Sequence, residues 1–326
     1  MTARAVVEPT RSWLSAYLVT MRPYLFFVSG AAGLLGEALV ESRSAWLRAA
    51  VFLPLFLAYG FGQALTDTFQ TDTDSVSAPY RPLVRGEISV NAVRAASLAG
   101  LAGSAIVLCL ASGWVAIPAT LAVLGLLLYT PCKRKYWAGP ACNAAVVALL
   151  PIIACVALAK QPWIALGDWR LLWGVLSVFG SYAVFVVIGY LKDVEADRMT
   201  GYDTLPVHFG VKPAVVASAA FATVGLLASC VLVGAQWRAV VSFSRAFPSM
   251  LFWGLGVAGL LVCHAQAWKV TRDDEAHPCI AWSVRSFLAL HLGEALAIDP
   301  SLVVVALALA ISFELVLSLR PQRSQI

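Results

Sequence analysis

Long apolar runs alternate with short polar segments along most of the chain. Runs of about 17 or more apolar residues recur, and each is long enough to cross a bilayer as one helix. This pattern predicts an all-α polytopic membrane protein, with about nine transmembrane helices held together by helix–helix packing. The predicted spans are residues 24–40, 49–66, 91–111, 114–130, 141–159, 171–191, 213–235, 249–268 and 301–319. A further apolar stretch, 280–298, is either a tenth span or part of the ninth, broken at Asp299–Pro300.

Composition supports the same class of protein. The 326 residues are 60% hydrophobic and 13% charged, with a mean hydropathy of +0.81. Soluble domains are about 45–50% apolar and about 25% charged. We therefore expect one membrane domain over residues 1–326, with residues 1–20 as a cytoplasmic N-terminal segment. The seven cysteines lie mostly inside apolar runs and form no C-x-x-C pair, so no disulfide framework is predicted.

The distribution of charge predicts an orientation. With the N-terminus in the cytoplasm, fifteen of the 23 Lys and Arg residues fall on the inner side, and eight, including Arg320 and Arg323, fall on the outer side. This distribution follows the positive-inside rule. We predict an integral, multi-pass protein of a bacterial-type inner membrane, with its polar loops on the cytoplasmic side. The basic residues are dispersed and form no nucleic-acid-binding stripe, so no nucleic acid partner is expected.

Two polar segments interrupt the apolar background and resemble each other. They are residues 66–89, TDTFQTDTDSVSAPYRPLVRGEIS, and residues 189–212, GYLKDVEADRMTGYDTLPVHFGVK. Each begins with acidic residues at the end of a predicted helix and then reaches a P-x-x-x-G turn, Pro82 to Gly86 and Pro206 to Gly210. The second segment follows the first by four spans. This spacing indicates an internal duplication that places both segments at the same face of the membrane.

The spacing of the acidic residues predicts a site for a divalent cation. If the second helix continues through residues 63–74, one face of it carries Gln63, Asp67, Gln70 and Asp74, while Asp72 points elsewhere. Asp193 and Asp197 are likewise neighbours on one face. Like charges at this spacing repel, and near a membrane such residues usually mark a functional site.

Magnesium is the cation that this arrangement favours. Mg²⁺ prefers oxygen ligands and is usually held by one or two carboxylates together with substrate phosphates. Two facing carboxylate pairs could hold two or three Mg²⁺ ions around a diphosphate. The basic residues that flank the acids, and could contact the same diphosphate, are Lys192, Arg198, Arg81 and Arg85.

At these residues the sequence resembles the UbiA superfamily of membrane prenyltransferases. The stretch YLKDVEADRMTGYDTLPVHFG is similar to the family's second aspartate motif, D-x-x-x-D followed by G-x-x-T-L-P-V-x-x-G. APYRPLVRGEIS is similar to its N-x-P-x-R-P-x-x-x-G-x-I-S. Shorter similarities are MRPYLFFVSG at 21–30, LYTPCKRK at 128–135 and Asn143. The resemblance extends from about residue 20 to about residue 235.

The resemblance implies a helical bundle around an intramembrane cavity, capped by the aspartate loops, in which Mg²⁺ holds an isoprenyl diphosphate. Asp67, Asp74, Asp193 and Asp197 fall on the family's metal-site positions and are the predicted catalytic residues, with Gln70 as a further metal ligand. The predicted diphosphate-binding residues are Lys192, Arg22, Arg81, Arg198 and Lys133. The predicted substrate-cavity residues are Gln63, Gln70, Tyr129, Tyr190 and Asn143.

The first motif departs from the family pattern N-D-x-x-D-x-x-x-D. Thr66 stands in place of the asparagine, and Gln70 stands in place of the middle aspartate. Both carry neutral oxygens, so the change predicts a different metal affinity or stoichiometry. Asp72 would compensate in part if the helix ended early and let this side chain turn inward.

The expected activity is Mg²⁺-dependent transfer of a prenyl group to an aromatic or other lipophilic acceptor in the membrane. The alternative is a terpene cyclase, in which the double bonds of farnesyl or geranylgeranyl diphosphate capture the cation without an acceptor. Tyrosines near the inner ends of spans, such as Tyr59 and Tyr182, and Phe61 are candidates to stabilise the cation, or they simply pack between helices. A transporter would place its acids at mid-membrane in broken helices, whereas these acids cluster at helix ends.

Overall fold

The computed structural model describes residues 11–41, 44–239 and 243–320, and this part of the chain contains no strand. The α-helices are α1 (Trp13–Met21), α2 (Phe26–Ala38), α3 (Ala45–Asp67), α4 (Thr71–Ser77), α5 (Val90–Ala111), α6 (Ala116–Lys133), α7 (Ala138–Leu158), α8 (Pro162–Leu166), α9 (Trp169–Tyr190), α10 (Val194–Met199), α11 (Leu205–Phe209), α12 (Val211–Ala239), α13 (Phe243–Ala267), α14 (His277–Ile298) and α15 (Val303–Ser318).

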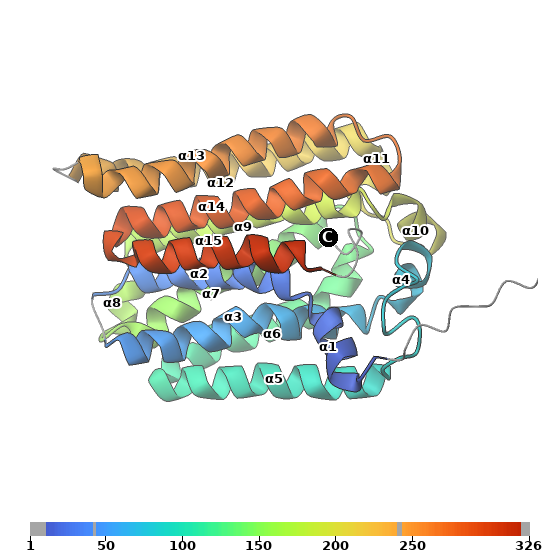
Figure 1. The fold of residues 1–326 in the computed structure, drawn as a ribbon, viewed down its shortest axis with the longest axis horizontal. Helices are drawn as coiled ribbons and strands as arrows, with labels where there is room; N and C mark the ends of the chain where they lie inside the picture. Colours follow the sequence, from blue (N-terminus) through green and yellow to red (C-terminus); the bar gives the residue numbers. More distant parts are fainter. Residues whose placement is uncertain (1–10, 42–43, 240–242, 321–326) are drawn as a thin grey trace, which may run out of the picture.

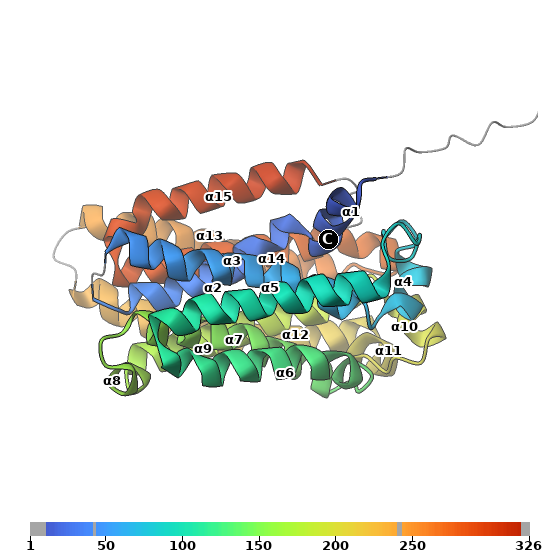
Figure 2. The ribbon, with the colours of Figure 1, turned by 90° about the horizontal axis from the view of Figure 1, so that it is seen from below.

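The long helices lie side by side in one bundle, and the short helices lie at its ends (Figures 1 and 2). The helices α4, α10 and α11 gather at one end, on the right of Figure 1, which we call the polar end. The opposite end, which carries α8, is the far end. The apolar core runs through most of the bundle and includes buried residues from Tyr24 to Leu317.

The predicted all-α bundle of about nine apolar spans is confirmed. Within the described ranges, nine helical stretches are long and apolar enough to cross a membrane. The first of them, Trp13–Ala38, joins α1 and α2 through a short 3-10 turn, so the helical path begins before the predicted start at residue 24. It therefore includes part of the predicted N-terminal segment 1–20, of which residues 1–10 lie outside the described part.

The ambiguous stretch 280–298 forms a helix of its own, α14. Its 22 residues correspond to about 33 Å, enough to cross the bundle, although its polar residues make it less apolar than the nine spans. It packs mainly on α13 and also on α2 and α9. The chain turns at Pro300–Leu302, where the Asp299 side chain accepts a hydrogen bond from the Ser301 N–H, and α15 runs back along the bundle.

Helix α14 changes the side of the bundle on which Arg320 lies. Because α14 runs the length of the bundle, α15 returns toward the polar end, and Arg320 lines a groove with Ser12 of the first helix cap. That cap lies at the polar end, because the neighbouring Arg11 pairs with Glu87 of the first polar segment at 3.4 Å. Arg320 therefore lies on the side of the polar segments and not on the opposite side as expected, and Arg323 lies outside the described residues.

Glycine allows a close approach between two of the long helices, α9 and α12. A Cβ atom built on Gly180 of α9 would lie 2.4 Å from the backbone nitrogen of Gly225 in α12. Small residues at such contacts are how membrane helices pack when lipid supplies no hydrophobic driving force between them. Gly103 of α5, by contrast, has nothing within 4 Å of a built Cβ.

Replacing Gly180 with alanine is expected to lower the free energy of unfolding by about 1–3 kcal/mol, because backbone atoms must move apart to admit the methyl group. The matched control is Gly103→Ala, which should be neutral or stabilising by about 0.5–1 kcal/mol, since alanine favours the helix. Thermal unfolding in detergent measures both variants. Equal melting temperatures for the two would contradict the close packing of α9 on α12.

Candidate active site

The first polar segment is not the continuous helix that the spacing suggested. Helix α3 ends at Asp67, and α4 begins at Thr71. The Thr68 hydroxyl donates to the Leu65 carbonyl at 2.7 Å, and Arg94 of α5 donates to the Thr68 carbonyl at 3.1 Å, so the groups freed by the break are satisfied. All four residues of the predicted stripe nevertheless line one cavity: Gln63, Asp67, Gln70 and Asp74.

The second polar segment repeats this arrangement. Helix α9 ends at Tyr190, and Asp193 is the residue that precedes α10. The turn glycine of each segment adopts a left-handed conformation, with φ of +70° at Gly86 and +89° at Gly210, where a side chain would be strained. The two P-x-x-x-G turns thus share a backbone feature as well as a sequence pattern.

Direct contacts join the two segments. The hydroxyls of Thr73 and Thr200 lie 3.1 Å apart, and the Tyr202 hydroxyl donates to Asp72 at 3.2 Å. The predicted convergence of the two segments is therefore confirmed. Asp72 also pairs with Arg134 at 3.1 Å and is 43% exposed, outside the residues that line the cavity, so it does not turn inward.

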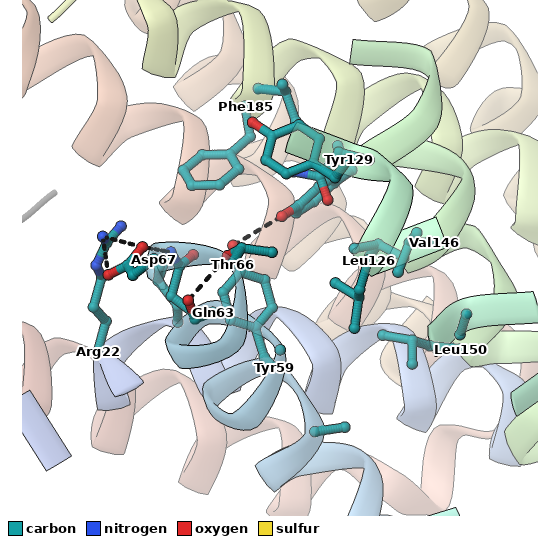
Figure 3. Close-up of a pocket in the computed structure, with 18 of the residues that line it drawn as sticks. Arg22, Tyr59, Gln63, Thr66, Asp67, Leu126, Tyr129, Val146, Leu150 and Phe185 are labelled. Carbon is teal, nitrogen blue, oxygen red and sulfur yellow. Dashed lines mark hydrogen bonds and ion pairs between the residues drawn. The ribbon is translucent and has the colours of Figure 1, made fainter. Parts of the chain in front are cut away.

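Asp67 and Asp74 are held by arginines at the cavity. Asp67 accepts from Arg22 at 2.8 Å and from the Gln63 amide at 2.7 Å. Asp74 forms an ion pair with Arg81, whose guanidinium also lies 3.9 Å from Asp67. Figure 3 shows the Arg22–Asp67 pair at one side of the pocket.

Arg81 also connects these acids with the second segment. Burial opposes its charge, but Asp74, Asp67 and Asp193 together raise the pKa of the Arg81 guanidinium. Burial likewise acts against the charge of Asp193, yet the cations Lys192, Lys133 and Arg81 lower the pKa of this carboxyl. Burial lowers the pKa of Lys192 to about 8, although Asp193 opposes the change.

Asp197 has surroundings that differ from those of Asp193. Its side chain is fully buried, pairs with Lys133 at 3.0 Å and accepts from the Thr204 hydroxyl at 3.2 Å. Asp197 is not among the residues that line the cavity, whereas Lys133 and Asp193 are. Lys133 also lies 3.5 Å from the side-chain oxygen of Gln70, so it spans the two segments.

Most of the predicted basic residues reach the cavity. The lining includes Arg22, Arg81, Lys133 and Lys192. Arg198 is exposed and outside the lining, and the flanking Arg85 pairs instead with Glu87 at 3.1 Å.

The cavity walls are aromatic near the charged groups and aliphatic beyond them. All the predicted cavity residues line it: Gln63, Gln70, Tyr129, Tyr190 and Asn143. Tyr59 and Tyr182 also line it, with their hydroxyls 2.8 Å apart, whereas Phe61 packs beside Gly100. Leu126, Val146 and Leu150 lie on the side away from the Arg22–Asp67 pair (Figure 3). The cavity volume is about 200 Å³.

Several lining residues were missed in the sequence. Four come from α5, Leu101, Ser104, Ala105 and Leu108, and four from α6, Ala119, Ala122, Val123 and Leu126. In each set the spacing is i, i+3, i+4 and i+7, which is one face of a helix. The signal was present as a stripe containing small residues, but membrane helices also use small residues for packing.

The residues present suit a magnesium ion that arrives with a diphosphate. Three carboxylates line the cavity, and each lies near a cation of the same cavity. Within the described residues, no three His, Cys, Asp or Glu side chains converge closely enough to hold one ion. Mg²⁺ is usually bound through one or two carboxylates plus substrate phosphates, so the site fits an ion shared with the ligand better than a cage made by protein alone.

Fold and site together define a membrane prenyltransferase architecture. Residues 24–291 match the UbiA prenyltransferase family, and the chain belongs to that family. The predicted resemblance is therefore confirmed, and it extends past the expected limit near residue 235 to within α14.

Proteins with a named product are among the relatives. The digeranylgeranylglyceryl phosphate synthase of Thermococcus kodakarensis is 27% identical over 217 residues, covering 66% of this chain and 76% of its own length. The protein of the same name from Halobacterium salinarum is 32% identical over 169 residues, covering 51% of this chain and 58% of its own.

Solved structures share the fold. A UbiA homolog from Aeropyrum pernix K1 has a TM-score of 0.65 at 18% identity, covering 83% of this chain and 96% of that one. A UbiA homolog from Archaeoglobus fulgidus, bound to DMAPP and Mg²⁺, has a TM-score of 0.61 at 17% identity, covering 84% of this chain and 98% of that one.

Removing the arginine between the two acids should destabilise the protein. Arg81→Met leaves the buried Asp74 without its partner, which is expected to cost about 3–5 kcal/mol, and adding Asp74→Leu should recover most of that loss. Thermal unfolding in detergent, without added diphosphate, measures both.

Arg85→Met is the matched control. Arg85 is 39% exposed, so its loss should cost no more than about 1 kcal/mol. A single Arg81→Met variant as stable as this control would show that the Arg81–Asp74 pair does not organise the site.

Proposed function

We propose that this chain transfers the prenyl group of an isoprenyl diphosphate to a lipophilic acceptor inside the membrane, in a Mg²⁺-dependent reaction. The observation that carries the proposal is the composition of one cavity. Carboxylates and basic side chains meet at its polar end, while the rest of its wall is mostly apolar and lies between membrane-spanning helices. A diphosphate and an isoprenoid chain, joined in one molecule, need these two environments side by side.

The charged residues would bind and orient the diphosphate. Arg22, Arg81 and Lys192 would leave their carboxylates and donate to phosphate oxygens, to which arginine binds in a bidentate manner. Asp67, Asp74 and Asp193 would hold Mg²⁺, which when bound neutralises the charge that develops on the leaving diphosphate. Preorganised cations of this kind stabilise charge most strongly where water is excluded.

The aromatic residues would surround the reacting carbon. The rings of Tyr59 and Phe185 lie in the wall between the charged groups and the aliphatic part (Figure 3), and the hydroxyl of Tyr182, another lining residue, lies 2.8 Å from that of Tyr59. Aromatic faces attract cations, so these rings suit a substrate whose allylic carbon becomes positive as the C–O bond breaks. The apolar wall beyond them keeps water from capturing that carbon before the acceptor does.

For the acceptor we propose a lipid with a glyceryl phosphate headgroup. The relatives described above are named for a glyceryl phosphate that carries geranylgeranyl groups. Their names give no support to an aromatic acceptor or to the terpene cyclase alternative. The basic side chains at the polar end offer partners for a phosphate on the acceptor as well as on the donor.

We also propose that the polar end faces the cytoplasm. The positive-inside distribution supports this orientation, and the placement of Arg320 near the polar end adds to it. The bacterial type of membrane stays a prediction.

Asp193→Asn is expected to lower diphosphate release at least about 100-fold, because it removes a charge that would hold the metal. Glu195→Gln is the matched control, since Glu195 lies two residues away, is exposed and does not line the cavity; it should keep wild-type activity. Diphosphate release from purified protein is measured with Mg²⁺ and with EDTA. Full activity of Asp193→Asn would refute the proposed reaction, and so would diphosphate release that EDTA does not reduce.

A panel of acceptors tests the acceptor class. With one isoprenyl diphosphate as donor, we expect an ether product from a prenylated glyceryl phosphate and none from a hydroxylated aromatic acid. Mass spectrometry of the lipid extract identifies the product. A cyclic hydrocarbon formed without any acceptor would instead establish the cyclase reaction.

A further inference from the structure

The ammonium group of Lys133 is held from several sides at the polar end of the cavity. It pairs with Asp197 at 3.0 Å and lies 3.5 Å from the side-chain oxygen of Gln70. The ring centres of Tyr190 and Tyr202 lie 5.5 Å and 5.0 Å from it, close enough for aromatic faces to attract a cation. The Lys133 side chain is only 5% exposed, so its charge depends on these partners.

Asp197 uses its two carboxylate oxygens inside the protein. One oxygen pairs with Lys133, and the other accepts a hydrogen bond from the Thr204 hydroxyl at 3.2 Å. Asp197 is fully buried and does not line the cavity, although Asp193, four residues earlier, does. The two acids of the second polar segment therefore face different surroundings.

The hydroxyl of Thr204 is not used as a helix cap. Thr204 is the residue before α11, where a threonine side chain usually accepts a hydrogen bond from a backbone N–H of the first turn. No such bond forms here, and the hydroxyl donates to Asp197 instead. Because Thr204 and Asp197 are both fully buried, this bond fixes the orientation of the carboxylate.

We propose that Asp197 is a positioning residue for Lys133 and not a ligand of the metal. Thr204 orients Asp197, and Asp197 in turn holds the Lys133 ammonium where it donates to the diphosphate. The lysine side chain has four flexible carbons, so a fixed carboxylate is needed to keep its ammonium in one place before the substrate binds. An ammonium has three donors, which allows it to contact Asp197 and a phosphate oxygen together.

This inference rests on the proposed function and assigns different roles to two acids that the family resemblance placed together at the metal. Asp193 lines the cavity and holds Mg²⁺ with the lining acids of the first segment, whereas Asp197 acts through Lys133.

Metal binding separates the two roles without any measurement of activity. Mn²⁺ binding to the purified protein in the presence of inorganic diphosphate is measured by electron paramagnetic resonance. Asp193→Asn should weaken Mn²⁺ binding at least about tenfold, because a charged ligand is lost. Asp197→Asn should leave Mn²⁺ binding unchanged. Equal weakening by the two variants would show that Asp197 is a metal ligand and would overturn the proposal.

Steady-state kinetics test the connection to Lys133. Asp197→Asn should lower kcat/KM for the isoprenyl diphosphate about 10- to 100-fold, as the loss of an outer-shell partner usually does, without changing the Mg²⁺ concentration that gives half the maximal rate. In a protein that already carries Lys133→Met, Asp197→Asn should cause no further loss, because the group that it positions is gone. Losses that simply multiply in the double variant would contradict the proposal.

Asp203→Asn is the matched control, since Asp203 belongs to the same segment but is 46% exposed and pairs with His208 at 3.0 Å. It should keep wild-type kcat/KM and Mn²⁺ binding.

Thr204→Val and Thr204→Ser provide the same test if a charge variant fails to fold. The valine variant lacks the hydroxyl and should lower kcat/KM without changing Mn²⁺ binding, whereas the serine variant keeps the hydroxyl and should retain wild-type values. Equal kcat/KM for these two variants would contradict the positioning role and leave prenyl transfer intact. A wild-type protein that releases diphosphate from no isoprenyl diphosphate would instead refute the proposed function itself.

Discussion

The structure depends on how opposite charges are paired at one end of a membrane bundle. Arg81 forms an ion pair with Asp74, lies near Asp67 and interacts with Asp193, so one guanidinium connects acids from both polar segments. Lys133 makes a second connection through Gln70 and Asp197. Burying such charges without partners would cost several kcal/mol each, so the two segments are stable in this position only together.

The same pairing explains how the site can be both stable and reactive. Each carboxylate of the cavity already has a cation nearby, so the site can exist without a ligand. A diphosphate is negative and a divalent metal is positive. The metal can therefore bind the carboxylates while the diphosphate binds the cations, and no buried charge is left without a partner. The cost of separating a protein pair is then offset by two new contacts of the same kind.

The sequence predicted the bundle, the spans and the two converging segments because these depend on local patterns. It predicted less well whatever depends on partners from distant helices. After the helix break at Asp67, Arg94 of α5 donates a hydrogen bond to the Thr68 carbonyl. Asp72 turns outward because Arg134 and Tyr202 bind it there. Helix α14 was ambiguous because it carries a buried network, in which Ser181 of α9 bonds His291 at 2.8 Å and His291 bonds Glu294 at 2.7 Å. Those polar residues lower the hydropathy of α14. They can be buried inside the bundle because they hydrogen-bond to one another and to Ser181 of α9.

The most direct test is a crystal structure of the protein with an unreactive isoprenyl diphosphate analogue and Mn²⁺. The anomalous scattering of Mn²⁺ shows where the metal is bound. The account predicts Mn²⁺ bound by oxygens of Asp67, Asp74 or Asp193, with Arg22, Arg81 and Lys192 on the phosphates. A diphosphate bound elsewhere, or held with all these ion pairs still closed and no metal beside them, would contradict it.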